Sequence, residues 1–368
     1  MTDKALCYII KIDIHFLVYI KLLLIGEIMF TDLGVDLGTR KTVIVRGKKI
    51  VLNQPSVVLM EEYDDSPYKY GKEAFEAIGR APGRYRPVCP IERGVISDYA
   101  VAEHMLRHYI QYACGKRMTK PRVVVSMPSN ITWVQQRSII DAVQNAGGRS
   151  VCTIEAPVAA ALGMGIDFKR PHGTIVVDIG AGTTDVAVIS MGGLSKCESV
   201  QVAGTDIDAA IIDYMKREYG LLIGEHTAEF IKCQVGTAIP RQVEIAIQAK
   251  GVNAATGLPK IVEITANEVC EAISDVVYRI CGAVRDVLDK TPPELVGDIA
   301  EDGIYLTGGT SQLTGMADCL SNYIGIKVTT ADNWEYCVAK GIGNVLHHFD
   351  LLANGDYEFQ TLQDLIVG

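Results

Sequence analysis

The chain has 368 residues, of which 48% are hydrophobic and 21% charged, and its net charge at pH 7 is −9. This length exceeds one typical domain, so we expect two domains, each with its own core. The acidic balance argues against non-specific nucleic-acid binding, which needs a basic face, so no nucleic-acid partner is expected. None of the ten cysteines lies at C-x-x-C spacing, which indicates neither a zinc site nor a redox pair. We therefore expect thiols in a reducing cytoplasm.

Residues 1–28 form an N-terminal extension of uncertain role. Its apolar run, 6–28, is interrupted by the charged side chains Lys11, Asp13 and Lys21. A central charge costs roughly 2.5–3.5 kcal/mol on insertion, so a spanning helix is disfavoured. The run also lacks the cleavage site of a signal peptide. Two interpretations stay open: translation starts at Met29, or the extension anchors the protein to a membrane surface.

Two strand–turn–strand motifs share one skeleton. The first, VDLGTRKTVIV, spans 35–45, and the second, VDIGAGTTDVAV, spans 177–188. In each, an aspartate is followed two residues later by glycine and six residues later by threonine, with β-branched residues after it. Strand, glycine turn and strand are typical of a β-hairpin. The repetition predicts two related halves.

The rest of the chain alternates between strands and helices. Between the two motifs we predict strands at 121–128 and 150–157, with helices at 131–147 and from 158. Beyond 193 we predict helices at 206–220 and 226–236, a hairpin at 241–265, a helix at 267–290 stopped by Pro292 and Pro293, and a strand, Gly-Gly turn and helix at 303–320. Such alternation predicts an α/β fold with helices covering the sheets.

The glycine turns suit phosphate binding. Glycine allows close approach of the backbone, and clustered amides and hydroxyls bind phosphate oxygens. Asp36 and Asp178, which precede the turns, repel phosphate but can hold the waters of Mg²⁺, which keeps much of its hydration shell. A single D-x-G turn is common in proteins of many functions. The matched pair, with Gly308 and Gly309 as a third turn, indicates a phosphate-binding site. We expect the two aspartates to face each other across an interdomain cleft and share a hydrated Mg²⁺ with a nucleotide.

Further segments resemble the MreB family, the bacterial actins of the actin, Hsp70 and sugar-kinase superfamily. They are LNQPSVV (52–58), RGVISDY (93–99), TGLPK (256–260), DKTPPELVGDI (289–299) and LTGGTSQLTG (306–315). The resemblance runs from Met29 to about Gly343. The D-x-G motifs identify the superfamily, whereas TGLPK and KTPPEL indicate the MreB branch. The usual start of the family favours Met29 as the first residue.

The resemblance implies an actin-like fold of the α/β class, a ribonuclease H-like duplication with two domains, four subdomains and a central nucleotide cleft. Domain I would comprise 29–168 and 342–368, with a small subdomain at about 60–102. Domain II would comprise 169–341, with a small subdomain at about 207–282.

The resemblance also implies ATP and Mg²⁺ as ligands. By motif match, the first phosphate loop holds Gly38, Thr39, Arg40 and Lys41, and the second holds Gly180, Ala181, Gly182 and Thr183. The nucleoside would lie near Glu225, His226, Thr227 and Ala228, and the adenosine over Gly308, Gly309, Thr310 and Ser311. Asp36 and Asp178 would organise the metal, and they are catalytic candidates together with Thr183 and Glu155.

One departure from the family concerns hydrolysis. This chain has IEAP where members have IEEP, so Ala156 replaces the glutamate expected to position the attacking water. Glu155 is an unlikely substitute, because neighbours in an extended segment point to opposite sides. A side chain that orients or activates the attacking water typically accelerates hydrolysis by ~10²–10⁴. We expect slow hydrolysis and long-lived filaments, unless Asp178, Thr183 and the metal suffice to hold the water.

The phosphate loops also differ from the family. DLGTRKT replaces the usual DLGTANT, so Arg40 and Lys41 add two cations, which either contact phosphate or face solvent. The second loop has GAGTTD instead of GGGTTE, a form associated with magnetosome-aligning actin relatives.

The resemblance implies a filament of identical subunits, with paired protofilaments, at the inner face of the cytoplasmic membrane. There it would organise cell shape and wall synthesis with membrane morphogenesis proteins. The loop 115–121 offers Met118 among cations, which suits a contact with lipid headgroups.

A filament that positions an organelle or plasmid is the main alternative. A sugar or acid kinase is disfavoured because the compact spacing leaves little room for an acceptor pocket, and an Hsp70-type chaperone is disfavoured because no peptide-binding domain follows.

Overall fold

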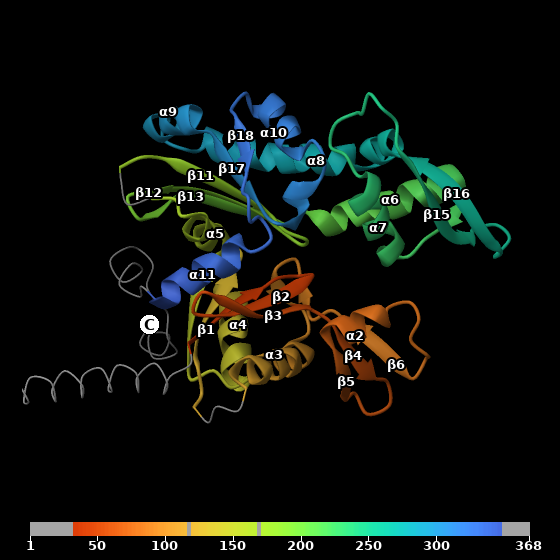
Figure 1. Cartoon of the computed structure of the whole chain (residues 1–368), viewed down its shortest axis with the longest axis horizontal. Helices are drawn as coiled ribbons and strands as arrows, with labels where there is room; N and C mark the ends of the chain where they lie inside the picture. Colours follow the sequence, from red (N-terminus) through yellow and green to blue (C-terminus); the bar gives the residue numbers. More distant parts are fainter. Residues whose placement is uncertain (1–31, 116–118, 168–170, 348–368) are drawn as a thin grey trace, which may run out of the picture.

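The computed structural model describes residues 32–115, 119–167 and 171–347. The N-terminal extension and Met118 lie outside the described residues. The described chain forms two halves, each built on a five-stranded sheet with a smaller three-stranded sheet beside it (Figure 1).

The first large sheet has the order β10-β9-β1-β2-β3. Its strands are β1 (Asp32–Leu37), β2 (Lys41–Arg46), β3 (Lys49–Pro55), β9 (Arg122–Met127) and β10 (Ser150–Glu155). The strands β1, β2 and β3 are antiparallel, whereas β1, β9 and β10 are parallel. The predicted first hairpin is therefore confirmed as β1 and β2.

The second large sheet repeats this arrangement in the order β13-β12-β11-β17-β18. Its strands are β11 (Thr174–Ile179), β12 (Thr184–Ser190), β13 (Gly193–Val200), β17 (Ile304–Thr307) and β18 (Val328–Thr330). Again the first three are antiparallel, and β11, β17 and β18 are parallel. Because strand order and directions match, the two hairpins occupy equivalent positions, as the repeated motif predicts.

The helices cover both sheets and fill the space between them. α3 (Tyr99–Cys114) and α4 (Trp133–Asn145) pack on the first sheet, and α8 (Ala266–Asp289), α9 (Pro293–Asp302) and α10 (Met316–Ile324) on the second. α5 (Ala156–Met164) and α11 (Cys337–His347) lie between the sheets (Figure 1). The long α8 forms because one face is continuously apolar and because Thr265 accepts a hydrogen bond from Glu268 N in a capping box.

Each half also carries a smaller sheet on the same side of the molecule (Figure 1). The first is β5 (Pro67–Tyr70), β4 (Val58–Glu61) and β6 (Tyr85–Val88), with α2 (Gly71–Glu76) and the short pair β7 (Ile91–Glu92) and β8 (Val95–Ile96). The second is β14 (Leu221–Leu222), β15 (Ala246–Asn253) and β16 (Pro259–Thr265), with α6 (Gly204–Tyr219) and α7 (Glu225–Val235). These four parts correspond to the four subdomains of an actin-like fold.

The helices α5 and α11 touch backbone to backbone. A Cβ placed on Gly163 would lie 1.9 Å from Cys337 O, and one on Gly341 would lie 1.7 Å from Ala159 O. Such distances are impossible for a real side chain, so glycine is required at both positions. At these two positions the helices meet without an intervening side chain.

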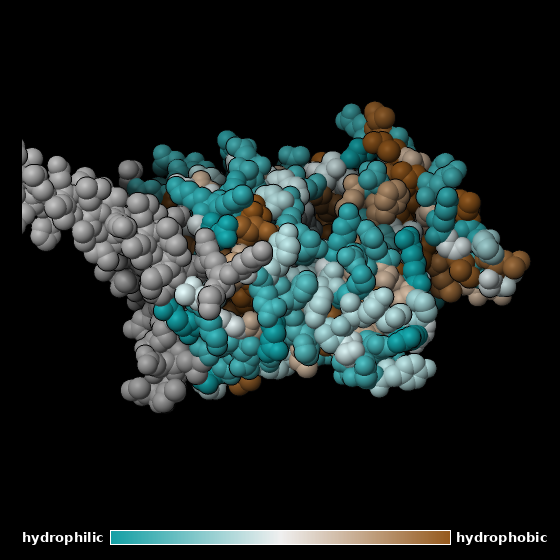
Figure 2. All heavy atoms as spheres, turned by 60° about the horizontal axis from the view of Figure 1, so that its bottom comes forward, coloured by the Kyte–Doolittle hydropathy of each residue, from teal (hydrophilic) through white to brown (hydrophobic). Residues whose placement is uncertain are grey.

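The surface is mainly hydrophilic on the face shown in Figure 2, and apolar side chains gather at the end that carries β15 and β16. The most exposed of these are Val243 (78%), Leu258 (63%) and Ile261 (57%). Within the described residues, no helix combines the length and apolar character needed to cross a membrane.

Candidate functional site

A cleft of about 490 Å³ lies between the two halves. Its walls are formed by the turns after β1 and β11, the loop after β17, and parts of α5, α7 and α11. The predicted site residues that line it are Asp36, Gly38, Thr39, Arg40, Lys41, Asp178, Gly180, Ala181, Gly182, Thr183, Gly308, Gly309 and Thr310. The fold thus brings together three glycine turns that are far apart in sequence.

Other predicted residues do not line the cleft: Glu155, Glu225, His226, Thr227, Ala228 and Ser311. Ala228 is fully buried in the core of the second half. His226 Nε2 lies 3.2 Å from Phe75 O, and its ring meets the Phe75 ring edge-on, so it joins the two small subdomains. Ser311 Oγ donates a 2.6 Å hydrogen bond to Gly308 O and so stabilises the third turn.

The first two turns are built alike and touch each other. Gly38 N donates to Lys41 O at 3.1 Å, and Gly180 N donates to Thr183 O at 2.9 Å, which is the same bond at equivalent positions. A Cβ on Gly182 would lie 2.3 Å from Thr39 Oγ1, so the second turn needs glycine to face the first. Two matched turns therefore oppose each other across the cleft.

The third turn packs directly on the second. Gly308 has φ +88°, and a Cβ there would lie 2.3 Å from Ile179 O and 2.5 Å from Asp178 Oδ1. Thr310 Oγ1 donates a 2.7 Å hydrogen bond to Gly180 O. Glycine at 308 thus allows the third turn to approach the aspartate that ends β11.

Two buried carboxylates lie in the cleft walls. Asp36 accepts a 2.9 Å hydrogen bond from Ser126 Oγ, and burial raises its pKa. Burial and, to a smaller extent, the charges of Asp185 and Asp36 raise the pKa of Asp178 to about 8. The charge of Asp36 acts on Asp178 because the two carboxylates share this cleft. A cation between them would relieve both the burial penalty and the repulsion.

The donor set fits Mg²⁺ better than a metal enclosed by protein ligands. The described part of the chain contains no cluster of three or more His, Cys, Asp or Glu side chains suited to a metal ion. Mg²⁺ is typically bound by one or two carboxylates together with waters and substrate phosphates. Asp36 and Asp178 would hold it, and it would supply positive charge to neutralise phosphate oxygens.

One carboxylate that lines the cleft, Asp185, was not predicted from the sequence as a site residue. Its side chain is 2% exposed, and burial raises its pKa to about 6. Its Oδ1 accepts a 2.9 Å hydrogen bond from Ser129 N of the first half, and its Oδ2 accepts one of 2.9 Å from Thr183 Oγ1. It therefore orients Thr183 and joins the halves. No local signal marked it, because the equivalent position of the first motif is Val43.

Several other lining residues were also missed: Ser126, Pro128, Glu229, Lys232, Trp334 and Glu335. They come from β9, α7 and the segment before α11, where the sequence shows only the pattern of a strand or an amphipathic helix. Lys41 Nζ lies 2.9 Å from Glu335 Oε1, so one added cation of the first turn already has a carboxylate partner.

The departure at the start of α5 is visible in the cleft. Ala156 is part of the lining, whereas Glu155 is not. Glu155 precedes α5 without capping it through its side chain, and burial raises the pKa of its carboxyl. The wall of the cleft therefore presents a methyl group at position 156.

A duplicated five-stranded sheet, with matched turns facing across a cleft, defines an actin-like fold. The MreB/Mbl protein family model matches residues 30–354. The cell shape-determining protein Mbl of Bacillus subtilis (strain 168) is 42% identical over 87% of this chain and 97% of its own length. The cell shape-determining protein MreB of Escherichia coli (strain K12) is also 42% identical, over 87% of this chain and 94% of its own. The chain belongs to the MreB/Mbl family.

Solved structures show the same similarity. The crystal structure of MreB5 of Spiroplasma citri bound to ADP has a TM-score of 0.84 and 30% identity, covering 89% of this chain and 99% of that chain. Its complex with AMPPNP has a TM-score of 0.82 and 30% identity, covering 87% and 97%. The actin-like fold expected from the sequence is confirmed.

Proposed function

We propose that this protein is an ATP-binding, filament-forming bacterial actin that determines cell shape. The observation that carries the proposal is the pair of matched turns, Gly38–Lys41 and Gly180–Thr183, which oppose each other with Asp36 and Asp178 behind them. Backbone amides in such turns suit phosphate oxygens, and the two carboxylates suit a hydrated Mg²⁺. The solved structures of MreB5 bound to ADP and to AMPPNP, to which this chain is similar, support nucleotide binding by this chain.

The proposal is tested by titration with ATP, with and without Mg²⁺, followed by sedimentation of the polymer. We expect saturable binding that requires Mg²⁺, and pelleting that requires both. Asp178→Asn removes one carboxylate and keeps the shape of the side chain, so its binding should lose most of the Mg²⁺ dependence. Binding of equal strength without Mg²⁺ in the wild-type protein contradicts the proposed site.

Self-association and location form the next part of the proposal. We expect a homopolymer of paired protofilaments at the inner surface of the cytoplasmic membrane, acting with membrane morphogenesis proteins in wall synthesis. Family membership supports the cell-shape role over the positioning of an organelle or plasmid. Imaging the tagged protein in its own cell tests this: filaments along the cell periphery, with rounding on depletion, are expected. Filaments that follow an organelle or plasmid would overturn it.

Hydrolysis is proposed to be slow. Ala156 offers no group to orient a water, and Glu155 is outside the lining. The remaining candidates for this role are Thr183, held by Asp185, and the metal-binding Asp178. Phosphate release after assembly should therefore lag behind that of a family member with IEEP. Equal rates in the two proteins would refute slow hydrolysis while leaving nucleotide binding intact.

A further inference from the structure

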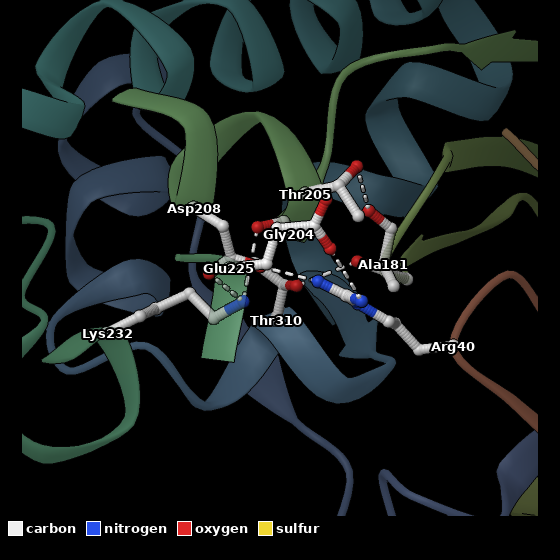
Figure 3. Close-up of polar contacts among 9 residues, drawn as sticks. Arg40, Ala181, Gly204, Thr205, Asp208, Glu225, Lys232 and Thr310 are labelled. Carbon is white, nitrogen blue, oxygen red and sulfur yellow. Dashed lines mark hydrogen bonds and ion pairs between the residues drawn. The ribbon is translucent and has the colours of Figure 1, made fainter. Parts of the chain in front are cut away.

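The turn between β1 and β2 carries an arginine that reaches the opposite wall of the cleft. Arg40 Nη2 lies 3.4 Å from Asp208 Oδ2 on α6, and Arg40 Nη1 lies 3.4 Å from Glu225 Oε2 at the start of α7 (Figure 3). Both acids belong to the second half of the molecule. Arg40 therefore forms ion pairs between the two halves, instead of facing solvent as one interpretation of the sequence allowed.

One of these acids is fixed on its own side. The Asp208 side chain is 3% exposed, and Lys232 Nζ on α7 lies 2.8 Å from Asp208 Oδ1. Lys232 Nζ also donates a 3.1 Å hydrogen bond to Gly204 O at the start of α6. The acceptor for Arg40 is thus held by a link between two helices, which lowers the entropy cost of the contact.

The charge balance of this wall depends on Arg40. Three carboxylates act on its guanidinium, namely Asp208, Glu225 and Glu229. Lys232 alone would leave an excess of two negative charges among these groups, whereas Arg40 reduces the excess to one. Without Arg40 the three carboxylates would repel one another more strongly, and they would also repel an incoming polyphosphate.

We propose that Arg40 is an interdomain clasp that keeps the cleft closed and slows the dissociation of a bound nucleotide. The inference rests on the proposed nucleotide site. Opening the cleft must separate both ion pairs, and contacts of this kind act mainly on dissociation rates. Among the described atoms, Arg40 Nε is buried without a hydrogen-bond partner, so the contacts of the guanidinium with these acids are the ion pairs of Nη1 and Nη2.

The first test follows the release of fluorescent ATP and ADP analogues after addition of excess unlabelled ATP. Arg40→Ala should accelerate release of both analogues about tenfold. Glu225→Gln should have a smaller effect, and the double variant should be no faster than Arg40→Ala, because the two residues form one contact. Arg285→Ala is the matched control, since Arg285 pairs with Asp289 on the exposed face of α8 and should keep the wild-type rate.

A second measurement needs no nucleotide. Small-angle X-ray scattering of the nucleotide-free monomer should give a larger radius of gyration for Arg40→Ala than for the wild type, with circular dichroism confirming that the variant is folded. Arg40→Gln serves if Arg40→Ala fails to fold. An unchanged radius together with unchanged release overturns the clasp, as does acceleration confined to the ATP analogue, which would make Arg40 a ligand of the terminal phosphate. Failure of the wild type to bind either analogue would instead refute the nucleotide site.

Discussion

Ala156 is the residue on which the proposal of slow hydrolysis rests. It is the first residue of α5 and lines the cleft, so a longer side chain there would extend into the cleft. Ala156→Glu should restore a carboxylate that orients water, raising single-turnover phosphate release by up to ~10²–10⁴. Quenched-flow assay of assembled protein measures this. Ala156→Met, which adds similar bulk without a carboxylate, is the control, and an equal acceleration by both variants would contradict a role for the charge.

At the same scale, the sequence predicted the residues whose role is encoded locally. Gly38, Gly180 and Gly308 could be found because a turn that binds phosphate needs glycine within a few residues of a strand end. Asp185 and Lys232 could not, because their roles depend on partners from other elements, Ser129 for Asp185 and α6 for Lys232. Such partners follow from tertiary packing, which no local pattern records.

Among the elements, the helices α4, α6, α7 and α8 were predicted within a few residues, whereas the helices α3 and α11 were not predicted. The third strands β3 and β13 were missed because their residues are mostly half-buried or exposed and lack a clear alternation. Pro292 and Pro293 were predicted to stop α8, and α8 indeed ends at Asp289, yet Pro293 also begins α9. Proline suits the first turn of a helix, so one signal serves both as a stop and as a start.

The packing of α5 against α11 gives an element-scale prediction. Gly341→Ala should destabilise the protein by about 1–3 kcal/mol or more, because its Cβ would lie 1.7 Å from Ala159 O and the two helices must separate. Chemical denaturation measures the change. Gly282→Ala is the matched control: Gly282 lies within α8 with open space around it, so alanine should stabilise by about 0.5–1 kcal/mol. Equal effects of the two substitutions would show that the helices are not in backbone contact.

The loop before β11 and the helix α9 are joined through a titratable contact. His172 Nδ1 lies 3.4 Å from Asp298 Oδ1, and His172 Nε2 lies 2.7 Å from Asp302 Oδ2. The hydrogen bond to Asp302 and the two negative charges raise the pKa of His172 above 6.5. A raised pKa stabilises the folded state fully below pH 6.5, and this stabilisation is lost as the pH rises through the folded-state pKa.

His172→Gln should therefore lower the melting temperature at pH 5.5 and leave it unchanged at pH 9. The effect should stay below about 1 kcal/mol because the pair is largely exposed. Asp302→Asn and the double variant complete a thermodynamic cycle at each pH. A coupling energy that is the same at both pH values would show that the histidine charge is not involved.

For the whole molecule, the described fold begins at Asp32, shortly after the second methionine at Met29. A protein that starts at Met29 should therefore have the same melting temperature and the same ATP affinity as the full chain. Thermal unfolding and the titration described above check this. Loss of folding in the shorter protein would assign residues 1–28 a structural role, and intact-mass measurement on the cellular protein decides which start is used.

The backbone contact between α5 and α11 also restricts how the two halves can move. Side chains usually absorb small shifts at an interface by changing rotamer, and Gly163 and Gly341 have none to change. We therefore expect the two halves to rotate as nearly rigid bodies about this contact. A change of a fraction of an ångström in the separation of the turns would grow with distance from the rotation axis. The strands of the small sheets, which lie farthest from it, would therefore shift most when a ligand binds.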